Sequence, residues 1–188
     1  MTRVVALLVA AVLALAALTA LTTLPAAPAA AHPLPSKKEW LADVREAMSG
    51  SHRWLERRAD RGGRTAVVLD IDNTAIASHY AFPRPVRPVL RFARHARELG
   101  VQVHFATARR QSELEGITRV LRRAGYRFTD VCGRHRGESI EHGKLRCRRA
   151  LERDGRAVIA MVGNRSTDFR GGRWERAFRL PSYRDRLN

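Results

Sequence analysis

Two carboxylates stand two residues apart at the end of an apolar run. The run from Thr65 to Ile71 is rich in β-branched residues, which is typical of a buried parallel strand. Asp70 and Asp72 fall where the chain would leave the sheet. Neighbouring carboxylates repel each other unless a cation binds between or beside them. Mg²⁺ and a phosphoryl group would give this arrangement a chemical purpose.

Three further polar groups occupy comparable positions later in the chain. Thr107 follows a second apolar run, Lys144 lies near the start of a predicted helix, and the acid-containing segment 163–168 follows a fourth run. Ligands of parallel α/β sheets bind beyond the carboxyl ends of the strands. The carboxylates, the hydroxyl and the ammonium are therefore expected to converge at one edge of a sheet.

Alternating helices and strands must position these groups. Apolar periodicity predicts helices over 86–99, 112–124 and 139–153, and strands over 101–106, 126–131, 157–162 and 177–180. Such alternation predicts an α/β fold, with a three-layer, Rossmann-like parallel sheet that carries helices on both faces.

The beginning of the chain has a different composition. Residues 1–31 carry one charge, an apolar run and a small-residue stretch ending at Ala31, which predicts a cleaved secretory signal peptide. An uncleaved N-terminal membrane anchor is the alternative, because the run approaches the roughly 20 residues that span a bilayer. Residues 32–62 show helical spacing broken near Gly50 and predict an N-terminal helical arm, followed by one domain over 63–188. We therefore expect a secreted, extracytoplasmic protein without membrane contact after cleavage.

The chain is strongly basic, with 35 Lys and Arg against 18 Asp and Glu and a formal net charge of +17. Such a surface attracts phosphate esters, nucleotides or acidic polymers without choosing among them. The cations are scattered along the sequence and aromatic residues are only 6%, so no dedicated nucleic-acid partner is expected. Cys132 and Cys147 could form a disulfide in an oxidising compartment or remain buried thiols. The oligomeric state is not indicated.

Taken together, the four motifs resemble those of the haloacid dehalogenase (HAD) superfamily. Its first motif, Asp-x-Asp-x-Thr after an apolar strand, is similar to the segment from Asp70 to Thr74. A Thr ending the second strand, a Lys before the fourth and an acidic motif after it follow in order. Two segments, Leu-Asp-Ile-Asp-Asn-Thr and Phe-Ala-Thr-Ala-Arg-Arg, are most similar to the motifs of the secreted acid-phosphatase branch, of the class B or subfamily IIIB type.

The resemblance implies a HAD-like phosphatase domain that hydrolyses phosphomonoesters. Asp70 would attack phosphorus to form an aspartyl-phosphate, and Asp72 would act as general acid and base. Thr107 and Lys144 would bind the phosphoryl oxygens. Independently of the resemblance, Arg109 and Arg110 closely follow Thr107 and could clamp the substrate phosphate, or be surface charges; we take Arg109 as a candidate phosphate contact.

The resemblance also implies a Mg²⁺ cofactor. Its ligands would be Asp70, the backbone carbonyl of Asp72, Asn164 and Asp168. The family usually shows Gly-Asp-x-x-x-Asp where this chain has Gly163 and Asn164. The amide keeps an oxygen ligand but removes a charge, which puts the strength of metal binding in question.

The motif spacing leaves no room for a large cap domain, so the site is expected to be open to a small phosphomonoester or nucleotide. Two other functions stay open. One is a non-catalytic HAD-fold binding protein for anionic envelope polymers or nucleotides. The other is a phosphotransferase that passes the phosphoryl group to an alcohol rather than to water.

Overall fold

The computed structural model describes residues 33–187 of the 188-residue chain. The predicted signal peptide, 1–31, lies outside the described residues, so its cleavage and the secretion of the protein stay predictions. The boundary between the helical arm and the domain also stays a prediction. Within 33–187, no helix is both long enough and apolar enough to cross a membrane.

A five-stranded parallel sheet forms the centre, in the order β3-β2-β1-β4-β5. The strands are β1 (Thr65–Leu69), β2 (Gln102–Arg110), β3 (Asp130–Arg134), β4 (Ala157–Gly163) and β5 (Arg176–Arg179). Every residue of β1 is buried, as expected of a central strand covered on both faces. The predicted α/β fold with a parallel, HAD-like sheet is confirmed.

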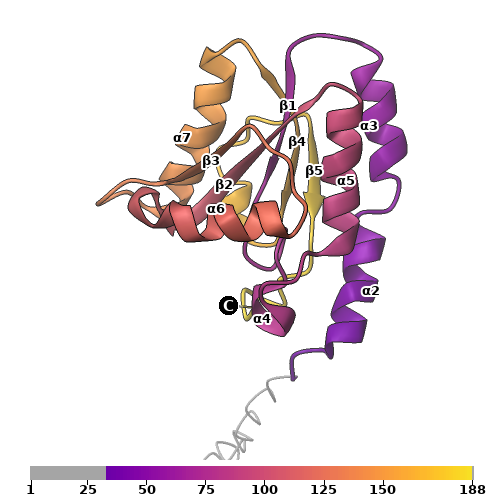
Figure 1. Cartoon of the computed structure of the whole chain (residues 1–188), viewed down its shortest axis with the longest axis vertical. Helices are drawn as coiled ribbons and strands as arrows, with labels where there is room; N and C mark the ends of the chain where they lie inside the picture. Colours follow the sequence, from indigo (N-terminus) through magenta and orange to yellow (C-terminus); the bar gives the residue numbers. More distant parts are fainter. Residues whose placement is uncertain (1–32, 188) are drawn as a thin grey trace, which may run out of the picture. The chain divides into compact units, whose positions relative to one another are not determined.

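Helices cover both faces of the sheet (Figure 1). They are α2 (Lys37–Ala47), α3 (Ser51–Ala59), α4 (Ser78–Ala81), α5 (Arg87–Glu98), α6 (Leu114–Arg123) and α7 (Ile140–Arg153). Trp40 of α2, Leu55 of α3 and Phe92 of α5 belong to the larger apolar cluster on one face. A smaller cluster lies under α7, around Met161 and Cys147.

The N-terminal helices form as the sequence predicts. Ser36 caps α2 through a reciprocal capping box with Glu39, and Gly50 separates α2 from α3 with a left-handed backbone (φ 70°). The buried Trp40 and Leu55 hold this arm against the domain rather than leaving it extended in solvent.

The third strand differs from its predicted position. It begins at Asp130 rather than at Tyr126, because the tyrosine ring is buried in the core. The Tyr126 hydroxyl donates to the carbonyl of Ala75 at 2.9 Å, and its ring meets Phe105 edge to face. Tyr126 therefore fills the core from the connection between α6 and β3, whose apolar residues had predicted a strand.

Cys132 of β3 and Cys147 of α7 form a disulfide. The bond joins α7 to a strand of the sheet that it covers. The question that the sequence left open is thus answered in favour of a disulfide.

Candidate active site

Three of the predicted site residues meet at the carboxyl edge of the sheet. Asp70 directly follows β1, Lys144 lies on the second turn of α7, and Asp168 ends the short helix η2 (Ser166–Asp168). The Lys144 Nζ donates to Asp70 Oδ1 at 2.6 Å and also to Asp168 Oδ1. All three side chains are buried. One ammonium therefore bridges two carboxylates that follow different strands, β1 and β4.

Burial dominates the electrostatics of this triad. It raises the pKa of Asp70 from 3.8 to about 7, although the charge of Lys144 acts in the opposite direction. Burial would lower the pKa of Lys144, but the attraction of Asp70 and Asp168 outweighs it and raises the value. Near neutral pH, Asp70 therefore lies close to its pKa, although a charged ammonium is beside it. Additional positive charge would favour the ionised form of Asp70.

Asp72 is held by a different set of partners. Arg109 forms a forked ion pair with it, with Nε 3.0 Å from Oδ2 and Nη2 2.7 Å from Oδ1. The hydroxyl of Ser78, on α4, donates to Oδ1 at 2.6 Å. Burial raises the pKa of Asp72, but these hydrogen bonds outweigh it and the net shift is downward. Asp72 is therefore ionised and partly exposed.

A cavity of about 260 Å³ opens over these groups. Asp70, Asp72 and Lys144 line it, together with Asn73, Ala108, Ile140, Arg165 and Leu187. The predicted residues Thr107, Arg109, Asn164 and Asp168 do not line the cavity. Thr107 is buried behind it, and its hydroxyl accepts from the backbone N–H of Arg109 at 3.3 Å. Part of the predicted set thus faces the opening and part lies beneath.

Asn164 carries a buried polar atom without a partner. Its Oδ1 accepts from the Thr74 hydroxyl at 3.4 Å, while its Nδ2 has no hydrogen-bond partner in the described part of the protein. A half-turn of the amide would exchange the two ends, so an oxygen can occupy the unpaired position. A buried amide oxygen without a donor suits a cation.

The remaining donors are oxygens, as Mg²⁺ prefers. Asp70 supplies a carboxylate, whereas the two carboxylate oxygens of Asp168 accept from Lys144 and from the Arg165 backbone N–H. Within residues 33–187, no cluster of three or more His, Cys, Asp or Glu side chains is arranged to hold a metal ion. Asp70 and Asn164 therefore fit Mg²⁺ better than Asp168 does in this arrangement, and waters would complete the coordination.

Several supporting residues could not be singled out from the sequence. Arg148 is fully buried and donates to the backbone carbonyls of Asp168 at 2.8 Å and Gly172 at 2.9 Å. Gly163 leaves space for the acid of η2, because a Cβ there would lie 2.3 Å from Asp168 Oδ2. Gly163 belongs to the last motif, so the sequence pattern pointed to its position. Arg148 is one of many arginines, and nothing in the sequence distinguishes it from the others.

Comparisons with known proteins agree with this architecture. The family model of the HAD superfamily, subfamily IIIB (acid phosphatase), matches residues 81–186, which include Thr107, Lys144 and Asp168 but begin after Asp72. No curated protein sequence matches the chain.

Two solved structures share the fold. The class C acid phosphatase from Bacillus anthracis with tungstate bound superposes with a TM-score of 0.60 at 17% identity, covering 72% of this chain and 67% of that one. Another structure of the class C acid phosphatase from Bacillus anthracis gives a TM-score of 0.60 at 16% identity, with the same coverage. The matched family model covers more than half of the chain, and the chain therefore belongs to subfamily IIIB, the acid phosphatases, of the HAD superfamily.

Proposed function

We propose that this protein is a secreted, Mg²⁺-dependent phosphomonoester hydrolase that acts through an aspartyl-phosphate on Asp70. The observation that carries the proposal is the buried Asp70–Lys144–Asp168 triad beneath a cavity at the carboxyl edge of the sheet. Membership of an acid-phosphatase family supports a phosphomonoester as the substrate.

Each residue then has a chemical task. An Asp70 carboxylate oxygen attacks phosphorus, and the bond between phosphorus and the leaving oxygen breaks. The leaving oxygen takes a proton from Asp72, which later accepts one from the water that hydrolyses the aspartyl-phosphate. Lys144 holds Asp70 in position and neutralises charge on the phosphoryl oxygens. Thr107 would donate a hydrogen bond to one of these oxygens.

Arg109 links substrate binding to the protonation of Asp72. In the free protein its guanidinium lowers the pKa of Asp72, which opposes the role of general acid. A substrate phosphate offers the guanidinium a second forked partner. Movement of Arg109 toward the phosphate would raise the pKa of Asp72 and let it hold the proton that the leaving group needs.

The residues that would hold Mg²⁺ are Asp70, Asn164 and the backbone carbonyl of Asp72. Asp168 would join them only if one of its oxygens left its present donor, Lys144 or the backbone N–H of Arg165. When bound there, the ion would supply positive charge that favours ionised Asp70 and balances charge on the phosphoryl oxygens. Asn164 stands where the family usually has a second carboxylate, so the site carries one negative charge less.

Hydrolysis of a chromogenic phosphomonoester by the purified protein tests the proposal. Release of the chromophore should require a divalent metal and should disappear in Asp70→Asn. The exposed Asp60→Asn is a matched control and should retain activity. Absence of release under every divalent metal, from folded protein, would favour a non-catalytic binding protein. Transfer to an added alcohol in preference to water would identify a phosphotransferase.

A further inference from the structure

Helix α5 carries a row of arginines along one side. Arg87, Arg91, Arg94 and Arg97 follow one another at helical spacings of four, three and three residues, and all four are exposed. Like charges at these spacings face each other and destabilise a helix. The row of arginines therefore destabilises helix α5, which suggests that it serves another purpose.

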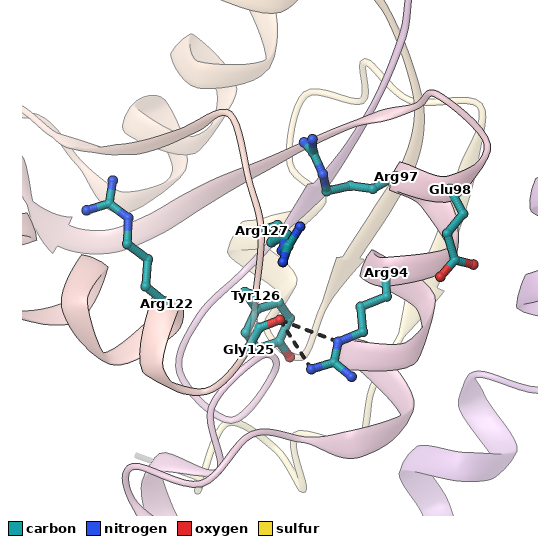
Figure 2. Close-up of a pocket in the computed structure, with 7 residues that line it drawn as sticks. All are labelled: Arg94, Arg97, Glu98, Arg122, Gly125, Tyr126 and Arg127. Carbon is teal, nitrogen blue, oxygen red and sulfur yellow. Dashed lines mark hydrogen bonds between the residues drawn. The ribbon is translucent and has the colours of Figure 1, made fainter.

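Two pockets lie along this row. The first, of about 610 Å³, is lined by Arg94 and Arg97 of α5, Arg122 of α6, and Arg127 beyond α6. Figure 2 shows these side chains coming from separate segments around Gly125, with dashed bonds only from Arg94 to the Gly125 carbonyl. The second pocket, of about 530 Å³, is lined by six cations, Lys37, Arg45, Arg84, Arg87, Arg91 and Arg123. We call the two pockets together the α5 basic surface.

A single acid lines the α5 basic surface. Its single carboxylate, that of Glu98, lies 3.3 Å from the Nδ1 of His95. Among the described residues, no carboxylate forms an ion pair with any of its ten cations. Elsewhere in the protein many arginines are paired, as in Arg58 with Glu175 and Arg146 with Glu138. These ten cations without an ion-pair partner in the described chain are scattered along the sequence, and the fold brings them together on one surface.

Local helix stability explains only part of this arrangement. Arg97 and Arg122 lie in the last turns of their helices, where cations interact favourably with the helix dipole. Arg87 is the first residue of α5 and Arg84 precedes it, whereas helix N-termini favour acids, and the first turn of α5 has none. The cations at this end are therefore unfavourable for the helix itself and suit an external anion.

We propose that the α5 basic surface binds a chain of inorganic polyphosphate. Guanidinium groups present forked donors that match phosphate oxygens. The row from Arg87 to Arg97 extends for about 15 Å, which favours a linear ligand over a single phosphate. The surface is hollowed into two pockets, which a flexible chain can enter and a flat membrane surface cannot fill.

The chemistry also separates this ligand from nucleic acid. Single-stranded nucleic acids gain affinity by stacking bases on exposed aromatic rings. Tyr126 lines the first pocket and Trp40 the second, but both side chains are buried and offer no ring for stacking. Phe82, the exposed large hydrophobic residue of the described chain, lines neither pocket. A polyanion without bases fits best. The surface shares no lining residue with the cavity over Asp70, so it is a second site and not an extension of the first.

Calorimetric titration with short-chain inorganic polyphosphate tests this site, with a chelator present to prevent turnover. The test variant is Arg87→Gln/Arg91→Gln/Arg97→Gln. The control is Arg136→Gln/Arg149→Gln/Arg153→Gln, which removes the same charge from exposed positions outside the surface. The test variant should bind about tenfold more weakly or worse. The slope of log affinity against log salt should fall by about three, one for each phosphate contact removed.

Three results would overturn the proposal. Equal weakening in both triple variants would show a response to net charge alone. Tighter binding of a thymidine oligonucleotide or of anionic lipid vesicles would assign the surface to another partner, and absence of polyphosphate binding would remove the site. Hydrolysis of a small phosphomonoester should be unchanged in the test variant, so this inference and the proposed function can fail separately.

Discussion

Replacing Lys144 with Met removes the cation that bridges two buried carboxylates. Only 2% of Lys144, 4% of Asp70 and 0% of Asp168 is exposed to solvent. Methionine fills a similar volume but leaves the carboxylates without their shared donor. Removing one partner of a buried ion pair costs about 3–5 kcal/mol. We expect the free energy of unfolding at neutral pH to fall by that amount.

The loss should depend on pH. In the native protein burial raises the pKa of Asp70 to about 7, above its ordinary 3.8. A carboxyl group with a raised pKa binds its proton more readily in the folded state, so its contribution to stability grows as pH falls from about 7 toward 4. Loss of the Lys144 charge raises this pKa further and extends the window upward. The variant should therefore be least destabilised near about pH 5 and most above about pH 8.

Urea unfolding followed by tryptophan fluorescence measures both effects. Lys38→Met, at an exposed position, is the matched control and should change the unfolding free energy little. In the double variant Lys144→Met/Asp168→Asn one of the two carboxylates is gone, so it should be more stable than Lys144→Met alone. A loss below about 1 kcal/mol, or one equal at all pH values, would refute the reasoning because it would match an exposed pair.

Three further predictions follow from individual contacts. Arg109→Gln should raise the pKa of Asp72 and move the alkaline limb of the kcat/KM profile to higher pH, and an unmoved limb would contradict the coupling. Serine at both Cys132 and Cys147 should lower the free energy of unfolding by about 3 kcal/mol, since the bond closes a 15-residue separation; denaturant titration checks this, and no loss would contradict it. Gly163→Ala should cost about 1–3 kcal/mol and impair turnover, because its Cβ would displace the acid of η2; wild-type kinetics would show that the acid need not stay in place.

Sequence patterns predicted the elements whose signals are local. The continuous apolar run of β1 required a strand buried on both faces, and the residue after it had to emerge at the sheet edge with its carboxylate. The convergence of Asp70 with Lys144 follows from this topology, because a parallel sheet places these segments at one end. Their roles in catalysis still stand as proposals.

What the sequence could not provide depends on long-range contacts. Tyr126 looks like part of a strand but fills the core, since its hydroxyl finds a carbonyl 51 residues away in sequence. Ser78 supports Asp72 from a four-residue helix that is too short for a periodic signal. The α5 basic surface combines cations from α2, α5 and α6, which only the fold brings together.

The most direct test of the account is a search for the phosphorylated protein. In Asp72→Asn, an activated phosphomonoester whose leaving group needs no proton should still phosphorylate Asp70, while hydrolysis of the intermediate is slowed. Rapid acid quenching and mass spectrometry should find one phosphoryl group on the peptide containing Asp70, and none in Asp70→Asn. A phosphoryl group on another residue, or turnover that persists in Asp70→Asn, would contradict the assignment of Asp70 as the nucleophile.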